Sequence, residues 1–357
     1  EYLEGLLSDP ARIAQLVSDE LEEVAEKFGT PRRTLLTEAR GAPVSAAAAR
    51  KSTPVLEIAD APCEVLLSTT GRAIRVDVTD DTAAGPARRR SKHDAIRSRI
   101  TTTSRTEIGA VTNLGRLIRF TAVDLPSVPA NSIQLAAGAK IAEYLAIGGK
   151  ERVLGFVKLD GEPIALGTRQ GVVKRVATGG WPGKPDFDII SLKPGDEIAG
   201  VSQGSDAAQL VFVTTHTQLL HFGASAVRPQ GASAGGMAGI NLSAKATVTF
   251  FGSIDPGEEN VVVTVSTSTT TIAGADPGRA KVSAISEFPG KGRATGGVRA
   301  HTFLKGEDVL GLAWVGRSPA LAVGTDGAVR ALPEPGAKRD ASGTPLDGVI
   351  GSIGESV

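Results

Sequence analysis

The stretch "NLGRLIRFTAVDLP", residues 113–126, reads as a tight turn followed by a strand that carries two arginines where a buried strand would carry valine. Side chains of a strand alternate between its two faces. Arg116 and Arg119 are three residues apart, so they cannot share one polar face unless a bulge or a strand end intervenes. Because both lie close to the turn, we expect both to reach solvent at a rim.

The same unit recurs along the chain as an apolar strand, a turn and a second strand that carries cations. The six copies span residues 64–78, 107–123, 163–178, 209–227, 260–289 and 319–333. Their turns are marked by Gly71, Gly115, Gly171, Thr217, Gly278 and Gly327, and subtraction of these numbers gives spacings of 44, 56, 46, 61 and 49 residues. Further strands are expected at 151–160, 196–206 and 308–317. This period is typical of a four-stranded propeller-type blade, and six copies can close a ring without exposed strand edges.

The N-terminal region differs from the repeats. Residues 8–29 carry apolar side chains at three- and four-residue spacing, with Ser8 or Asp9 as the expected cap and Gly29 as the stop, which predicts an amphipathic helix. Residues 41–54 are rich in Ala, Pro and Ser without an apolar period, which predicts a linker. We therefore expect a helical segment over 1–40, a linker over 41–59 and an all-β domain over 60–357. The acidic helical start without Met suggests a piece of a longer protein.

Composition narrows the class of protein. The chain has 357 residues, with 4% aromatic residues and 43 glycines, which suits many short strands and turns. The single cysteine, Cys63, excludes an internal disulfide and indicates a small packing residue. The sequence has neither a signal peptide nor an apolar run of membrane-spanning length. His216 and His221 are five apart and so face opposite sides of a strand, which argues against a shared metal ion.

Cations recur at matching positions of the repeats. Taken singly, they are solvated strand residues that keep edges from aggregating. Equivalent positions of a ring lie on one circumference, however, so their recurrence predicts a curved positive belt that suits duplex DNA. The residues expected to contact DNA are Arg72, Arg75, Arg88, Arg89, Arg90, Lys92, Arg97, Arg99, Arg116, Arg119, Lys174, Arg175, Arg228, Arg279, Lys281, Lys291, Arg293 and Arg330.

The densest of these clusters is "PARRRSKHDAIRSR", residues 86–99, with six cations against the single acid Asp94. Such a stretch is too charged to pack, which leaves two interpretations: a solvated loop or an arm that contacts phosphates. It contains no aromatic side chain, so backbone contact is favoured over base stacking. Residues 1–27 carry eight acids against two cations, so the zero formal net charge combines an acidic helix with a mildly basic ring.

The hairpins "GRAIRV", "GRLIRF", "QGVVKR" and "GRAKVSAISEFPGKGRATGGVRA" resemble the blades of the C-terminal domain of the bacterial type IIA topoisomerase A subunit, which DNA gyrase and topoisomerase IV share in design. The stretch "DPARIAQLVSDELEEVAEKFGTPRRT", residues 9–34, resembles the last helix of that subunit's breakage–reunion core. The resemblance covers nearly the whole chain. It implies a six-bladed β-pinwheel that binds and bends DNA and presents it for strand passage.

The resemblance also implies an A₂B₂ holoenzyme with an ATPase B subunit, located in the cytoplasm with the nucleoid. That enzyme uses ATP and Mg²⁺, and neither is expected to bind to this piece. The family's cleavage tyrosine has an arginine neighbour, whereas Tyr2 and Tyr144 do not, so we expect no catalytic residue here and a non-catalytic DNA-binding role.

The resemblance leaves the subfamily open. Gyrases carry a Gln-Arg-Arg-Gly-Gly-type box in the first blade, but the corresponding stretch "GPARRRSKHDAIRSR" lacks the glycine pair. This favours a topoisomerase IV-like protein over a gyrase-like one with a degenerate box. Two other classes remain as alternatives, a propeller that scaffolds protein partners and, more weakly, a propeller hydrolase or lyase.

Overall fold

The computed structural model describes residues 9–29, 60–78, 95–130, 133–270 and 276–356. The chain divides into two compact units, residues 1–57 and 58–357. Within the first unit, helix α2 (Pro10–Phe28) begins after Asp9, whose side chain accepts a hydrogen bond from the amide of Ala11, and ends at Gly29. This helix lies within residues 8–29, where the sequence predicts one. Its apolar stripe is exposed within this unit, and the exposed fraction of Phe28 is 74%.

The second unit is an array of antiparallel hairpins, and all six predicted hairpins are present. They are β1 (Pro62–Ser68) with β2 (Arg72–Asp77), β4 (Glu107–Thr112) with β5 (Arg116–Thr121), β9 (Ile164–Thr168) with β10 (Val172–Val176), β13 (Gln209–Thr214) with β14 (Gln218–Gly223), β17 (Asn260–Thr267) with β18 (Arg279–Ala284), and β21 (Ala320–Gly324) with β22 (Val329–Arg330). The prediction of an all-β class is confirmed.

An inner strand pairs with the first strand of each hairpin. The inner strands are β3 (Ile96–Thr103), β8 (Val153–Lys158), β12 (Ile198–Gln203), β16 (Val248–Ile254), β20 (Val309–Arg317) and β24 (Ile350–Glu355). Successive inner strands contact one another around the whole unit. Three of them, β8, β12 and β20, lie in the segments where the sequence predicts further strands.

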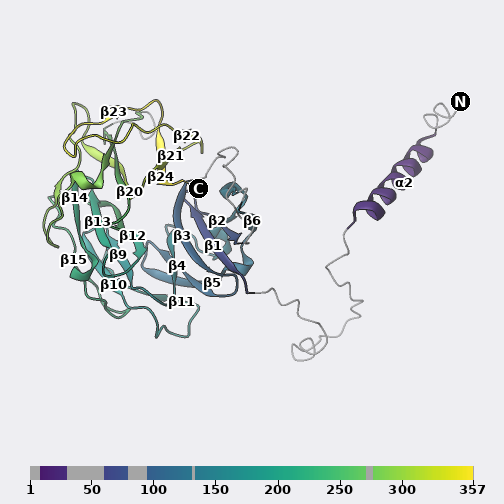
Figure 1. Ribbon diagram of the computed structural model, residues 1–357, viewed down its shortest axis with the longest axis horizontal. Helices are drawn as coiled ribbons and strands as arrows, with labels where there is room; N and C mark the ends of the chain where they lie inside the picture. Colours follow the sequence, from purple (N-terminus) through teal and green to yellow (C-terminus); the bar gives the residue numbers. More distant parts are fainter. Residues whose placement is uncertain (1–8, 30–59, 79–94, 131–132, 271–275, 357) are drawn as a thin grey trace. The chain divides into compact units, whose positions relative to one another are not determined.

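A short outer strand pairs with the second strand of five hairpins. The outer strands are β6 (Ser127–Pro129) and β7 (Ala139–Lys140) on β2, β11 (Asp186–Asp188) on β5, β15 (Met237–Ala238) on β10, β19 (Val298–Arg299) on β14, and β23 (Thr344–Pro345) on β18. Each outer strand comes after one hairpin in the sequence but pairs with the hairpin before it. Neighbouring hairpins are therefore interleaved. Figure 1 shows β11, β15 and β23 at the margin of the ring and β3, β12 and β20 nearer its middle.

Short helical turns connect these strands. They are the helix α4 (Ile141–Tyr144) and the 3₁₀ turns η1 (Ala122–Asp124), η2 (Leu135–Ala137), η3 (Ala224–Ala226) and η4 (Ile285–Glu287).

The ring closes between its first and last strands. The largest sheet has the order β22-β21-β24-β3-β1-β2-β6, so β24 near the C-terminus pairs with β3 through Glu355 and Ile96. The hydroxyl of Ser352 donates to that of Thr69 over 2.8 Å at the same junction. Buried apolar side chains form clusters between neighbouring hairpins, and Cys63 lies in one of them, as expected of a packing residue.

The six marker residues share one backbone conformation. Gly71, Gly115, Gly171, Thr217, Gly278 and Gly327 all have a positive φ, between 65° and 82°. In two of these turns, the main-chain carbonyl of the marker glycine accepts a hydrogen bond from an amide that follows an outer strand. The carbonyl of Gly115 accepts the amide of Ile189 over 2.9 Å, and that of Gly171 accepts the amide of Ile240 over 3.0 Å. The turns therefore hold the chain that follows the outer strands.

Two marker glycines make a matched pair for a test of stability. Gly71 and Gly171 have φ of 81° and 82°, but a Cβ on Gly171 would lie 2.7 Å from the carbonyl oxygen of Ile240, whereas one on Gly71 would meet nothing within 4 Å. We expect Gly71→Ala to lower the free energy of unfolding by about 1–2 kcal/mol through φ alone. Gly171→Ala should cost roughly 1–3 kcal/mol more through the clash. Urea unfolding of both variants measures the difference, and equal losses would contradict it.

Candidate nucleic-acid interface

The cations of the second hairpin strands bind the outer segments of the chain. The fourth residue of β2, β5, β10 and β14 is Arg75, Arg119, Arg175 or His221, and each side chain hydrogen-bonds to a main-chain carbonyl of the segment that leads into the outer strand. The acceptors are the carbonyls of Val123 at 3.1 Å, Pro182 at 2.8 Å, Ala224 at 3.2 Å and Phe288 at 2.8 Å respectively. Arg72 and Arg279, at the first position of their strands, donate in the same way to Gly138 and Gly343.

Lysines at the third position of two strands are buried. Nζ of Lys174 donates to the carbonyls of Ile189, Ala232 and Ala234 at 2.7–2.8 Å, and Nζ of Lys281 donates to those of Lys338 and Arg339. Burial lowers the pKa of each lysine to about 8. The other second strands carry Ile74, Ile118 and Leu220 at this position. The two lysines therefore replace an apolar side chain with one that hydrogen-bonds to the outer loops.

These placements correct the prediction of a positive rim built from strand cations. Lys174, Arg175 and Lys281 have exposed fractions of 2% or less, so they cannot reach a bound polyanion. Most of the remaining strand arginines are engaged in ion pairs, whereas Arg72 and Arg97 bind main-chain carbonyls. The ion-pair partners are Asp77 for Arg75, Glu64 for Arg99, Glu151 and Asp186 for Arg116, Glu107 for Arg119, Glu307 for Arg279 and Asp326 for Arg330.

The basic stretch 86–99 divides into two parts. Arg88, Arg89, Arg90 and Lys92 lie outside the described residues. The prediction that the stretch cannot pack is wrong for its end, because Ile96–Thr103 forms the inner strand β3 with Ile96 and Ile100 buried. Arg97 and Arg99 therefore belong to the middle of the ring. Arg97 donates to the carbonyl of Thr69 over 3.0 Å.

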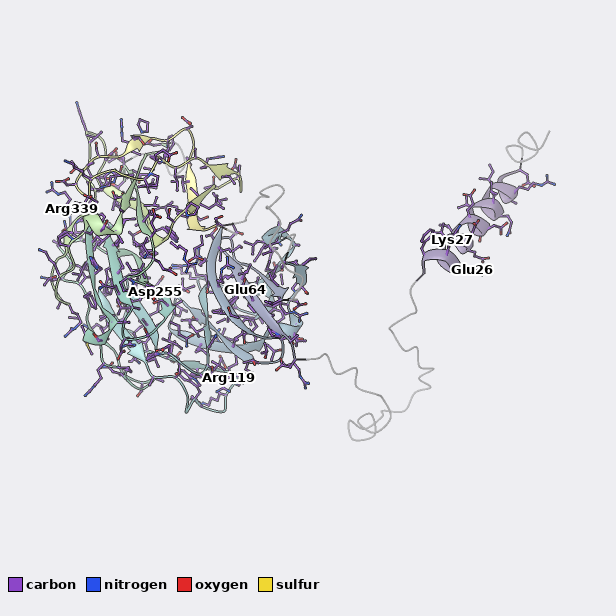
Figure 2. All side chains as sticks on the ribbon, viewed as in Figure 1. Glu26, Lys27, Glu64, Arg119, Asp255 and Arg339 are labelled. Atoms are coloured by element: carbon purple, nitrogen blue, oxygen red, sulfur yellow. The ribbon has the colours of Figure 1, made fainter. Side chains whose placement is uncertain are left out.

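Several cations without a carboxylate partner lie on the outer segments, while Lys193, Lys245 and Lys305 are exposed in the loops that lead to the inner strands. The sequence predicted Arg228, Lys291 and Arg293, and the structure places all three on the outer segments. It adds Lys184, Arg299, Lys338 and Arg339, which sequence reasoning missed. Figure 2 shows Arg339 at the margin of the ring. The overlooked signal is a Pro-Gly or Pro-x-Gly turn beside a cation, at residues 182–184, 228–231, 289–293 and 335–339.

The segment 288–299 is the most basic of these outer segments. It carries Lys291, Arg293 and Arg299 and no acid, whereas 181–188 and 334–345 each contain two acids. Lys291 and Arg299 are exposed and make no ion pair among the described residues. The guanidinium of Arg293 donates to the carbonyl of Ala238 on β15, so this segment crosses to the neighbouring outer strand. The arrangement presents three cations along adjacent outer strands.

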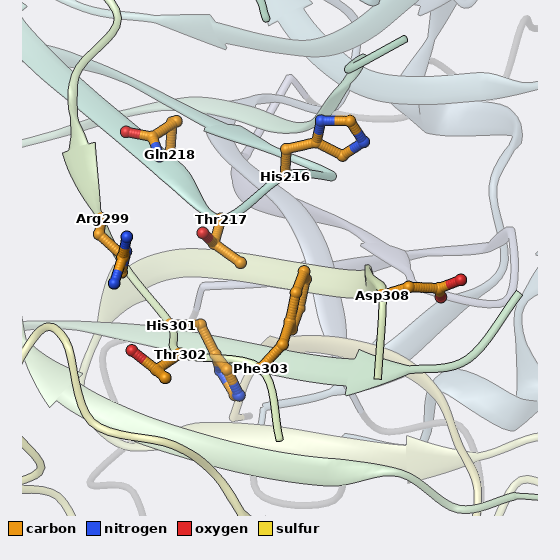
Figure 3. Close-up of a pocket in the computed structure, with 8 residues that line it drawn as sticks. All are labelled: His216, Thr217, Gln218, Arg299, His301, Thr302, Phe303 and Asp308. Carbon is orange, nitrogen blue, oxygen red and sulfur yellow. The ribbon is translucent and has the colours of Figure 1, made fainter. Parts of the chain in front are cut away.

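An open pocket of about 470 Å³ lies beside Arg299 (Figure 3). Its lining residues are His216, Thr217, Gln218, Arg299, His301, Thr302, Phe303 and Asp308. His301 is buried where the equivalent residues of the two preceding loops are Ile190 and Ile240. Its Nδ1 lies 2.9 Å from the hydroxyl of Thr264, and its Nε2 has no partner among the described residues. Burial, with Lys281 nearby, lowers the pKa of His301 to about 4, so the ring is neutral at pH 7.

The described residues hold no group of three or more His, Cys, Asp or Glu side chains that could bind a metal ion. Among the same residues, no helix has the length and apolar character needed to cross a membrane.

Comparison with known proteins supports the resemblance found in the sequence. A family model described as "DNA gyrase C-terminal domain, beta-propeller" matches residues 208–255 and 278–313. The DNA gyrase A protein of Mycolicibacterium smegmatis is 26% identical over 310 residues, and that of Mycobacterium tuberculosis is 27% identical over the same length. Each alignment covers 83% of this chain but 34% of the relative, so the chain spans about a third of the length of these gyrase proteins.

Solved structures share the fold. The crystal structure of the C-terminal domain of DNA topoisomerase IV superposes with a TM-score of 0.64 at 18% identity, over 83% of this chain and 93% of that one. The DNA gyrase A C-terminal domain gives a TM-score of 0.57 at 15% identity, over 83% and 100%. The resemblance to the C-terminal domain of the type IIA topoisomerase A subunit is therefore confirmed.

The buried His301 makes stability depend on pH. Its pKa is about 4 in the folded chain and about 6.5 when unfolded, so the unfolded chain binds a proton that the folded chain does not between these values. We expect the free energy of unfolding to fall by up to about 3 kcal/mol as the pH drops from 6.5 to 4. His301→Ile, the residue at the equivalent positions, should flatten this part of the profile. Urea titrations at half-unit pH steps measure it, and parallel profiles would contradict the assignment.

Proposed function

We propose that residues 60–356 form the six-bladed β-pinwheel of a type IIA topoisomerase A subunit, where they serve as a non-catalytic domain that binds and bends duplex DNA along its outer segments. The six hairpins, each with an inner strand and five of them with an outer strand from a neighbour, support the six-bladed arrangement. The observation that carries the DNA-binding role is the acid-free outer segment 288–299. Its Lys291 and Arg299 face solvent, while most other arginines of the ring are paired.

Phosphate contact is the recognition mode that fits this segment. Lys291 and Arg299 are long, flexible cations on a turn and a two-residue strand. The nearby aromatic side chains of Phe288 and Phe303 are buried and half-buried respectively, which favours phosphate contact over base stacking. Bending a short duplex costs on the order of 1–6 kcal/mol, which requires several spread contacts rather than one strong one. Cations on successive outer segments, from Lys184 through Arg228 to Arg339, provide that spread. The stretch containing Arg88, Arg89, Arg90 and Lys92 stays a predicted additional contact.

The whole enzyme is a further part of the proposal, because the chain spans about a third of its curated relatives. We propose that the complete protein forms an A₂B₂ assembly with an ATPase B subunit in the cytoplasm, and that ATP, Mg²⁺ and the cleavage tyrosine belong to parts of that assembly outside this chain. A propeller that scaffolds protein partners is the alternative, and a failure to bind DNA would favour it.

Two subfamilies compete for this chain. The missing glycine pair in "GPARRRSKHDAIRSR" favours a topoisomerase IV-like guide for the transported segment. The sequence relatives reported above are gyrase A proteins, which favours chiral wrapping and supercoiling. We place the chain with the topoisomerase IV-like proteins on the evidence of the box.

DNA binding by the isolated chain should depend on the outer cations. We expect Lys291→Ala with Arg299→Ala to reduce the slope of log affinity against log salt by about 1.8, since each phosphate contact contributes about 0.9. The control is Lys158→Ala with Arg317→Ala, which removes two exposed cations at ends of the inner strands β8 and β20, and it should leave the slope unchanged. Arg317 differs from the tested residues in that it is paired with Glu258. Fluorescence anisotropy with a duplex of about 40 base pairs at several salt concentrations measures both slopes. Equal effects of the two pairs would argue against the outer segments as the interface.

The subfamily is tested with the full-length protein. We compare it with a version lacking the segment that corresponds to residues 60–357, each reconstituted with its B subunit, in a plasmid topology assay. A topoisomerase IV-like domain should leave ATP-dependent relaxation in place while decatenation weakens. Negative supercoiling by the full-length enzyme that disappears on deletion would instead place the chain with the gyrases.

A further inference from the structure

One clamp recurs in four successive hairpins and joins the second strand to the outer segment. The residue at the fourth position uses both its main chain and its side chain. The main chain of Arg119 donates to the carbonyl of Pro185 over 2.8 Å, and that of His221 accepts from the amide of Lys291 over 3.1 Å. The side chains at this position bind carbonyls of the same segments, as described above. Three of the four side chains are arginines, and the fourth is His221.

His221 clamps the most basic outer segment. Its Nε2–H donates to the carbonyl of Phe288 over 2.8 Å. Its Nδ1 lies 2.7 Å from the side-chain amide of Gln209 on the neighbouring strand, which donates to this nitrogen when the amide is turned to present its NH₂ group. The loop also packs against the imidazole of His221, because a Cβ on Gly290 would lie 3.2 Å from its Cε1 atom. Both ring nitrogens of His221 therefore have a neighbour that holds them in place, and the imidazole supports the turn that carries Lys291.

We propose that His221 is a positioning residue for DNA binding: it holds the turn 288–293 so that Lys291 and Arg293 face the phosphates, without touching DNA itself. This inference rests on the proposed function. The imidazole is half-buried, and two hydrogen bonds and the overlying Gly290 occupy it. His221 fixes the direction of Lys291 and Arg293 before DNA binds. Less conformational freedom is therefore lost on binding.

The chain contains the design of a rescue variant. The cross-strand neighbour of His221 is Val211, and in the first hairpin the neighbour of Arg75 is Val65, so an arginine fits opposite a valine at this position. We therefore expect His221→Arg to restore a donor to the carbonyl of Phe288, as Arg75 supplies one to Val123. His221→Ala removes the donor and leaves the turn to its main-chain bonds and to the bond from Arg293 to the carbonyl of Ala238.

Two measurements on the 357-residue chain test the proposal. Hydrogen exchange without DNA should show faster exchange of amides 290–295 in His221→Ala and wild-type rates in His221→Arg. The salt slope for the same duplex should fall by about 1.8 in His221→Ala, as it should in Lys291→Ala with Arg293→Ala, and return in His221→Arg. Combining His221→Ala with the double substitution should reduce the slope no further. A merely structural role would not produce this non-additivity.

Arg75→Ala is the matched control. It breaks the same clamp on an outer segment, residues 122–138, that contains no lysine or arginine. We expect faster exchange of amides near Val123 and Val128 but an unchanged salt slope. Thermal melts of all variants set a temperature at which each is folded, so a loss of affinity cannot arise from unfolding.

Several results would overturn the proposal: a wild-type slope in His221→Ala, no rescue by His221→Arg, a further loss in the combined variant, or an equal loss in Arg75→Ala. If the wild-type chain does not bind duplex DNA, the proposed function fails together with the positioning role. In that case the exchange data alone report whether the clamp exists. If the wild-type chain binds and only the His221 variants behave otherwise than expected, the proposed function stands and this inference falls.

Discussion

The ring depends on side-chain donors for the main-chain carbonyls of its outer segments. A long strand satisfies its carbonyls through a ladder with its neighbour, but the outer strands β15, β19 and β23 are only two residues long. The carbonyls before and after them would be left without partners, at a cost of about 1–3 kcal/mol for each buried group. Arginine, lysine and histidine on the second hairpin strand reach outward and donate to them. The recurring cations are therefore first of all a structural device.

These hydrogen bonds explain why a strand can carry two cations on opposite faces directly after its turn. Arg116 and Arg119 point to opposite faces, and each finds a separate partner: Arg116 pairs with Glu151 and Asp186, and Arg119 reaches Glu107 and the carbonyl of Pro182. Adjacent cations on β10 follow the same rule. Lys174 is buried and donates to three carbonyls of the outer segments, while Arg175 pairs with Asp206 and donates to the carbonyl of Ala224.

The sequence predicted the hairpins because their signal is local. Apolar runs flank a turn residue, and the match of the runs at 209–227 to the other copies places Thr217 at the glycine position. Its φ of 65° shows the same left-handed turn. The outer strands escaped notice because two paired residues, such as Met237 and Ala238, leave no periodic pattern. The direction of the cations escaped notice for a different reason. Alternation states which face a side chain leaves from, but not whether a long side chain ends in solvent or on a carbonyl several residues away.

Pairing of the strand cations leaves the outer turns to supply the charge for the proposed binding of DNA. This division suits a domain that bends its ligand. A duplex that is bent exerts a restoring force on each contact, and a cation on a loose turn would move with the DNA instead of holding it. The outer segments resist such movement because each follows one hairpin, pairs with the preceding one and is clamped there through its carbonyls. A load applied at Lys291 therefore passes to β14 through His221 and to β15 through Arg293, so two neighbouring sheets share it.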